Sequence, residues 1–188
     1  MFSEWKQKLN RGVALAYYDL VFGSCDIDSE LPGRLGFKKI GIVDEDIQVV
    51  DVSGGKKANS TDAIAVGPAG AALIGEASRG VKSILIKDYS LDNSLVAAIA
   101  ENNTILVMPV SDLMKVSGIK RSRLMFKMQR LVESAKKHKI QVAFVTMADS
   151  RGNMCSYMQL IELSKLIGAD GDYARRSVSE TNRVLVND

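Results

Sequence analysis

The sequence predicts an α/β fold built from short parallel strands and intervening helices. Four continuous apolar runs after residue 60 have the length and composition of strands in a sheet that is covered on both faces. Segments with helical periodicity separate these runs, which gives the strand–helix alternation of a parallel sheet. Such a chain folds either as an open doubly wound sheet or as a barrel, and the residues alone leave both open.

The expected elements follow one another along the chain. Residues 1–10 are polar and resemble the start of a helix, and they lack the apolar segment of a signal peptide. Strands are expected at residues 16–21, 39–43, 47–52, 62–66, 83–87, 104–110 and 141–147. Helices are expected at residues 70–79, 92–102, 122–138 and 156–167, and in a terminal segment. Asp92 is placed to cap the second helix, and Pro32, Gly33 and Gly36 mark a short, distorted first connection.

Size and composition exclude several classes of protein. The 188 residues are expected to form one domain, residues 1–188, that buries about two-thirds of the surface of the unfolded chain. Cys25 and Cys155 lie far apart and outside any CxxC pair, which argues against a disulfide framework or a zinc ribbon and favours a reducing cytoplasm. The only histidine, His138, lies among lysines that repel cations, so a histidine-based metal site or catalytic triad is not expected. No apolar run has the length of a membrane span, so no membrane association is expected.

The strongest signal is the distribution of charge. The net charge is only +3, but residues 115–139 hold nine Lys or Arg and one acid, Glu133, so this segment carries +8 and the rest carries −5. On the expected helix 122–138, a core-facing stripe at helical spacing consists of Leu124, Met128, Leu131, Val132 and Ala135. A second stripe consists of Arg123, Lys127, Arg130 and Lys137, and it is preceded by Lys120 and Arg121.

These basic side chains repel one another, and a bound polyanion would relieve the repulsion. Such a stripe would bind phosphates and would not read bases. An ordinary solvated helix flank explains the same pattern equally well. Arg175 and Arg176, with Arg183, form a second basic group near the C-terminus, which joins the first if the chain end packs beside the long helix. Phe126 lies on neither stripe, and an exposed aromatic residue there would suit a protein partner.

Other features suggest a metal or phosphate site. Aspartates in the first third could bind magnesium if several of them reached one strand end: Asp19, Asp26, Asp28, Asp44, Asp46 and Asp51. The strand-to-helix turn at residues 67–70 could expose N–H groups to a phosphate, but Pro68 removes a donor and the spacing is not GxGxxG. The loop at residues 53–57 lacks Walker spacing. Turn chemistry and close packing explain these features better than a site does.

Several segments then follow one another in a characteristic order. They are residues 108 and 120–139, 144–150 (Phe-Val-Thr-Met-Ala-Asp-Ser), 160–163, 166–168 and 174–179 (Ala-Arg-Arg-Ser-Val-Ser). Near the start come residues 18–20 (Tyr-Asp-Leu) and 35–42 (Leu-Gly-Phe-Lys-Lys-Ile-Gly-Ile). In this order and spacing the chain resembles protein component 3 of archaeal ribonuclease P, a family to which a eukaryotic subunit is related.

The resemblance implies a distorted, somewhat trimmed TIM-like β/α barrel of the metal-dependent-phosphoesterase-like superfamily, without its metal site. It implies a subunit of the ribonucleoprotein that removes the 5′ leader from precursor tRNA. In that assembly the RNA binds the catalytic Mg²⁺, the protein binds no cofactor, and no side chain of this chain is a catalyst. The implied partners are the ribonuclease P RNA, precursor tRNA indirectly, and other protein subunits, especially one small subunit paired with this one.

The family pattern transfers only in part. A basic residue follows the alanine of the late Ala-x-x-Ser segment, and Arg175 fills that place. Where the family has Arg-x-Pro-Arg-Asp, residues 155–159 read Cys-Ser-Tyr-Met-Gln, so Arg151 in the preceding loop is the candidate substitute. The expected RNA-binding residues are Lys120, Arg121, Arg123, Lys127, Arg130, Lys137, Arg151, Arg175 and Arg176, with no catalytic or metal-binding residue. The alternatives are a free-standing metal-dependent phosphohydrolase of TIM-like fold and a protein-interaction barrel without RNA contact.

Overall fold

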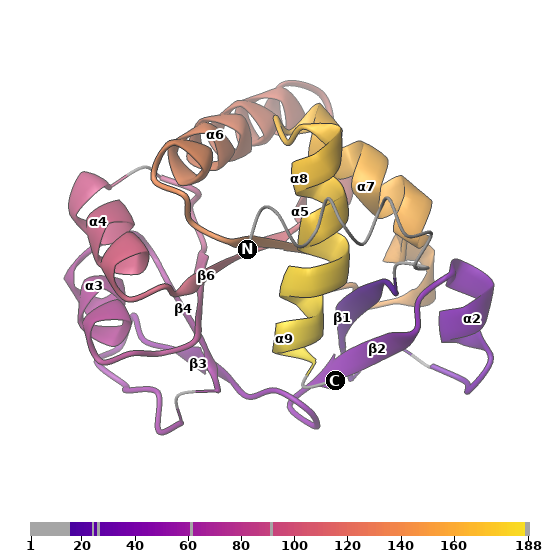
Figure 1. Cartoon of the computed structure of the whole chain (residues 1–188), viewed down its shortest axis with the longest axis horizontal. Helices are drawn as coiled ribbons and strands as arrows, with labels where there is room; N and C mark the ends of the chain where they lie inside the picture. Colours follow the sequence, from indigo (N-terminus) through magenta and orange to yellow (C-terminus); the bar gives the residue numbers. More distant parts are fainter. Residues whose placement is uncertain (1–15, 24, 26, 61, 91, 187–188) are drawn as a thin grey trace.

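This computed structural model describes residues 16–186, apart from residues 24, 26, 61 and 91. The described part of the chain contains seven strands with helices between them (Figure 1). The helix start expected at residues 1–10 lies outside this part, as does Asp26. All structural statements below concern the described residues.

The seven strands lie at the expected positions. They are β1 (Tyr18–Phe22), β2 (Lys39–Val43), β3 (Val49–Asp51), β4 (Ile64–Gly67), β5 (Ser83–Ile86), β6 (Ile105–Pro109) and β7 (Val142–Val145). β1 and β2 form a two-stranded parallel sheet, and β3 to β7 form a five-stranded parallel sheet in chain order. The α/β fold with parallel sheets is therefore confirmed, and the strand order has no reversal of the kind that defines a doubly wound sheet.

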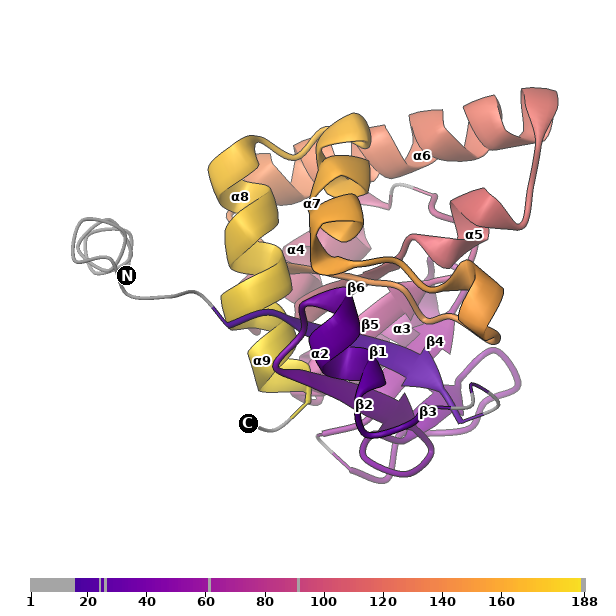
Figure 2. The same cartoon turned by 90° about the vertical axis from the view of Figure 1, so that its right-hand side faces the viewer.

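Helices pack around these sheets, most of them on the outer side (Figures 1 and 2). They are α2 (Leu31–Leu35), α3 (Ala71–Ser78), α4 (Asn93–Glu101), α5 (Ser111–Met114), α6 (Gly118–Lys137), η1 (Arg151–Asn153), α7 (Tyr157–Leu166), α8 (Gly171–Arg176), η2 (Ser177–Thr181) and α9 (Asn182–Leu185). Asp92 caps α4 as expected, because its side chain accepts hydrogen bonds from the N–H groups of Ser94 and Leu95. The structure differs from the expectation in the short helix α5 and in α6, which begins four residues earlier.

The strands bury both of their faces, because side chains alternate along a strand. One face packs against the helices, with Phe144 of β7 and Leu106 of β6 in this cluster. The opposite face contributes to a second cluster that contains residues of both sheets, such as Leu20 of β1 and Val66 of β4. Leu185 of α9 belongs to this second cluster, so the end of the described chain packs against the inner face of the strands.

Along β7, the backbone groups on the edge that faces β1 form hydrogen bonds with side chains of the C-terminal helical segment. The Ser177 hydroxyl donates to the Val142 carbonyl and accepts from the Phe144 N–H at 3.0 Å. The Asn182 amide donates to the carbonyls of Phe144 at 2.6 Å and of Tyr18 at 2.9 Å. Both side chains are buried, so they satisfy backbone groups that water does not reach.

Backbone pairing between β1 and this part of the chain begins only after β7 has ended. The Met147 N–H donates to the Leu20 carbonyl at 2.7 Å, and the Phe22 N–H donates to the Ala148 carbonyl at 3.0 Å. The two sheets are therefore linked by hydrogen bonds along β1, although they are separate ladders.

We expect Asn182→Ala to lower the free energy of unfolding by about 1–3 kcal/mol, because the carbonyls of Tyr18 and Phe144 lose a buried donor. Urea denaturation followed by circular dichroism measures this. Arg183→Ala, at the exposed neighbouring position, is the control and should change stability by less than about 0.5 kcal/mol. Equal stabilities of the two variants would contradict the pairing role of Asn182.

Candidate nucleic-acid interface

The long helix α6 presents the basic segment to solvent. Its 20 residues extend over about 30 Å. Met128, Leu131, Val132 and Ala135 are buried, as the predicted core-facing stripe requires, and Leu124 is half-buried. Residues 118–123 are exposed without exception, and Figure 2 shows this end of α6 extending past α7. The helix is thus anchored by its second half and projects at its beginning.

Six of the nine predicted RNA-binding residues lie on α6, and all six are exposed: Lys120, Arg121, Arg123, Lys127, Arg130 and Lys137. Arg121 donates from Nε to the Val116 carbonyl at 2.7 Å, and Lys127 donates from Nζ to the Asp88 carbonyl at 3.1 Å. The other four make no ion pair or hydrogen bond within the described part of the chain. Their charges remain available to an anion.

The start of α6 concentrates positive charge. No acidic residue lies in its first turn, and the side chain of the N-cap residue Ser117 makes no capping hydrogen bond. Lys120, Arg121 and Arg123 lie within the first two turns, where the helix dipole already contributes partial positive charge. The missing acidic residue, the missing cap and the basic side chains all make the start of the free helix less stable, and they favour binding of a negatively charged ligand there.

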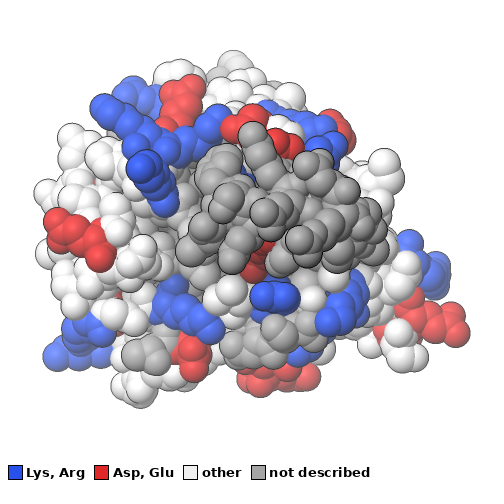
Figure 3. Space-filling view, viewed as in Figure 1, with Lys and Arg blue, Asp and Glu red and all other residues white. Residues whose placement is uncertain are grey.

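The second basic group, Arg175 and Arg176 on α8, lies near α6, with acidic residues between them. Asp170 caps α8 and pairs with Lys136 of α6 at 3.2 Å, so α8 begins beside the end of the long helix. Arg175 lies 3.6 Å from Asp172, and the Arg176 guanidinium lies 6.0 Å from the centre of the Tyr173 ring. Figure 3 shows Lys and Arg gathered along the top of this face with acidic residues among them. The chain end packs beside α6 as the sequence allowed, but acids lie between the two basic groups.

Arg151 is held in a different environment. It lies in η1 and forms an ion pair with Asp28 at 2.5 Å, and this contact lowers the pKa of Asp28. The candidate substitute for the missing family arginines is therefore engaged by an acidic residue of its own chain. α7 begins instead with a capping box, in which the Ser156 hydroxyl accepts from the Gln159 N–H and the Gln159 side chain accepts from the Ser156 N–H.

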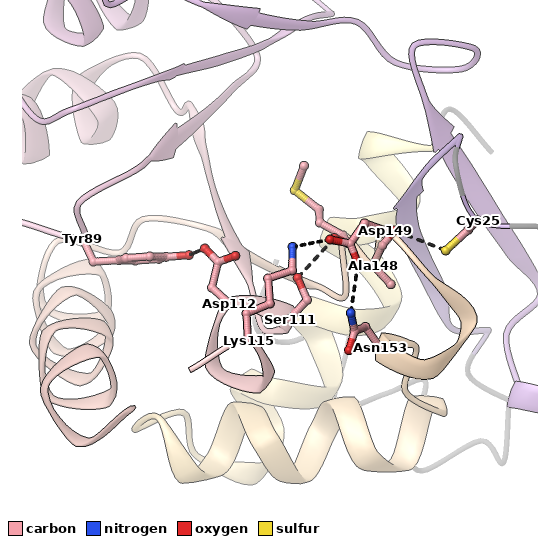
Figure 4. A network of polar contacts seen from close by, with 9 residues as sticks. Cys25, Tyr89, Ser111, Asp112, Lys115, Ala148, Asp149 and Asn153 are labelled. Atoms are coloured by element: carbon pink, nitrogen blue, oxygen red, sulfur yellow. Dashed lines mark hydrogen bonds and ion pairs between the residues drawn. The ribbon is translucent and has the colours of Figure 1, made fainter. Parts of the chain in front are cut away.

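Polar groups at the carboxyl ends of β5, β6 and β7 pair with one another (Figure 4). Enzymes built on parallel α/β sheets place their catalytic groups at this edge. Here the Tyr89 hydroxyl donates to Asp112 at 2.6 Å, and Asp149 pairs with Lys115 at 2.9 Å and accepts from Asn153 at 2.9 Å. The hydrogen bond from Lys115 lowers the pKa of Asp149, so its charge is already neutralised by a partner.

The aspartates of the first third are dispersed. Asp51 pairs with Lys87 at 2.6 Å, and Asp46 accepts from the Ile42 N–H at 2.8 Å within its own turn. The described residues contain no group of three or more His, Cys, Asp or Glu that could hold a metal ion. In the turn after β4, the Ala69 N–H donates to Asp88 at 3.2 Å, so one phosphate-binding donor is occupied. These features therefore do not come together in one cluster within the part of the chain that the structure describes.

Asp19 is fully buried, and its carboxylate forms hydrogen bonds within the core. It lies on β1, accepts from the Thr146 N–H at 2.7 Å, and accepts a second hydrogen bond from the Thr146 hydroxyl. Burial raises the pKa of Asp19 to about 7, against the lowering effect of the hydrogen bond from the Thr146 N–H. The carboxyl group therefore continues the pairing of β1 with the end of β7, and the one sequence signal for this role is the placement of a polar residue within an apolar strand.

Comparison with known proteins places the chain in a structural class. No protein-family profile matches the sequence, and no curated protein matches it. Among solved structures, similar chains share the α/β fold with parallel sheets, at identities at which only the fold can be compared. Within the described residues, no helix is long and apolar enough to cross a membrane.

One of these chains belongs to the cryo-EM structure of an archaeal ribonuclease P with mature tRNA. The match covers 98% of this chain and 86% of that chain, with a TM-score of 0.62 and 14% identity. Another is the ochratoxinase of A. niger, with a TM-score of 0.55 and 14% identity over 97% of this chain and 58% of the other. The chain therefore shares its fold with a chain of an archaeal ribonuclease P structure and with an ochratoxinase.

We expect Asp19→Asn to alter the pH dependence of stability. Because the pKa of Asp19 is raised from 3.8 to about 7, its contribution to stability is full below about pH 4 and is lost as the pH rises through about 7. The stability of the variant relative to the wild type should therefore increase over that window. Urea denaturation at a series of pH values measures the difference, and parallel profiles for the two proteins would contradict the inferred environment of Asp19.

Proposed function

We propose that this chain is a protein subunit of ribonuclease P that binds the RNA component through the outer face of α6. The observation that carries the proposal is the row of exposed basic residues without partners among the described residues: Lys120, Arg123, Arg130 and Lys137. A helix about 30 Å long that carries such a row fits a polyanion with regularly spaced charges. The similarity in fold to a chain of archaeal ribonuclease P supports the same assembly.

The chemistry of this function resides in the RNA. In this proposal the RNA component binds Mg²⁺ and cleaves the 5′ leader of precursor tRNA, and the protein contributes no catalytic side chain. The paired groups at the carboxyl ends of the strands support this division, because Asp112 and Asp149 are each engaged by a neighbour. Among the described residues, no cluster of possible metal ligands supports the alternative of a metal-dependent phosphohydrolase.

We further propose that the two sheets are parts of one distorted, trimmed barrel over residues 1–188. Backbone hydrogen bonds from Met147 to Leu20 and from Phe22 to Ala148 support closure on one side. A single parallel bridge between Val43 and Ile47 supports it on the other. The shared inner cluster, with residues from each of the seven strands, is what a filled barrel interior requires.

The remaining partners follow from the assembly. Precursor tRNA would be reached through the RNA component, and other protein subunits, including one small paired subunit, would bind surfaces away from the basic row of α6. A cytoplasmic location is proposed on the same basis.

We expect the triple variant Arg123→Ala, Arg130→Ala, Lys137→Ala to bind ribonuclease P RNA more weakly and to show a shallower salt dependence. Loss of three phosphate contacts reduces the slope of log K against log salt by about 2–3. Filter binding at several salt concentrations measures this, and cleavage of precursor tRNA by the reconstituted complex at moderate Mg²⁺ should fall in parallel.

The matched control is Arg34→Ala, Lys56→Ala, Lys57→Ala, which removes the same charge from exposed positions outside α6. It should keep most of the affinity. If both triple variants bind RNA equally well, and both are folded, the role assigned to α6 is wrong.

A further inference from the structure

Phe126 occupies the outer face of α6 and is 60% exposed. It lies three residues after Arg123 and four before Arg130, so all three side chains are neighbours on the helix surface. Both arginines are exposed and have no partner within the described residues. An exposed aromatic side chain therefore lies on the helix surface between two arginines, one turn away on each side.

The surroundings on α6 do not fit a protein-binding core. The residues one turn from Phe126 on either side are polar: Ser122, Arg123, Gln129 and Arg130. Ile119, 73% exposed, is two turns away on the same face, at about 10 Å along the axis. The centre of a protein interface is depleted of charge and contiguous in apolar area, and here charged groups flank the ring on both sides.

A nucleotide fits this arrangement better. An unpaired base stacks on an aromatic ring in proteins that bind single-stranded RNA, while arginines contact the phosphates on either side. Along α6, Arg123 and Arg130 lie about 5–6 Å from Phe126, which is one helical turn in each direction. The spacing places one positive group on each side of a stacked base.

We propose that Phe126 stacks on an unpaired base of the bound RNA, with Arg123 and Arg130 binding the adjoining phosphates. The proposal rests on the proposed function and narrows it: α6 engages a single-stranded segment and not only the backbone of a duplex. It replaces the expectation that Phe126 contacts a protein partner.

The test compares the binding of the full chain to an unstructured single-stranded RNA and to the duplex that this RNA forms with its complement. Fluorescence anisotropy of the labelled RNA gives both affinities. Phe126→Leu keeps an apolar side chain but removes the ring, and it should lower single-strand affinity about tenfold while leaving duplex affinity unchanged. Phe126→Tyr should retain wild-type affinity for both RNAs.

Leu166→Ala is the matched control, because Leu166 is an exposed apolar residue close to α6. It is 54% exposed at the end of α7, and its carbonyl accepts a hydrogen bond from Gln129 of α6 at 3.0 Å. It should bind both RNAs like the wild type. Thermal melting checks that each variant is folded.

Three results would overturn the stacking proposal. Wild-type single-strand affinity in Phe126→Leu removes it, and equal losses on both RNAs show that the ring does not read an unpaired base. Unchanged RNA affinity with weakened binding of a ribonuclease P protein subunit by both Phe126→Leu and Leu166→Ala assigns the ring to a protein interface. The proposed function fails separately, and the stacking proposal with it, if the wild-type chain does not bind ribonuclease P RNA.

Discussion

The buried edge of β7 is the constraint on which the arrangement of the chain ends depends. Its backbone groups lie away from water and must be paired, yet β1 reaches hydrogen-bonding distance only beyond Val145. Ser177 and Asn182 fill the gap from the C-terminal segment. Residues five apart point about 140° away from each other on an α-helix, whereas the π-helical turn η2 brings them to nearly the same side. One irregular turn thus lets two side chains complete the edge of one strand.

The polar groups at the strand ends and those on the outer surface differ in whether they have partners within the described residues. The groups at the carboxyl ends of the strands already have partners: Asp112 accepts a hydrogen bond from Tyr89, and Asp149 pairs with Lys115. Enzymes with parallel α/β folds place their reactive groups at this edge. The unpaired charge lies instead on the solvent side of α6, which is fixed to the core through Met128, Leu131 and Val132. The fold also occurs in an ochratoxinase, and in this chain the proposed binding surface lies on a helix.

The sequence predicted what local pattern determines. All seven strands were recognisable because buried parallel strands are continuous apolar runs, and the inward and outward faces of α6 followed from helical periodicity. Long-range pairing could not be predicted: nothing in the local sequence links Arg151 to Asp28 or Lys136 to Asp170. The structural roles of Ser177 and Asn182 were missed for the same reason. The one available signal was the placement of polar Asp19 within an apolar strand.

The charge at the projecting start of α6 has a thermodynamic consequence for the free protein. Residues 118–123 are exposed, and their basic side chains oppose the helix dipole, so we expect these turns to open at a lower free energy than the buried second half of α6. A polyanion bound there reverses the electrostatic term and, by mass action, raises the stability of the folded chain. In the proposed complex with RNA, the start of α6 would therefore be more stable than in the free chain.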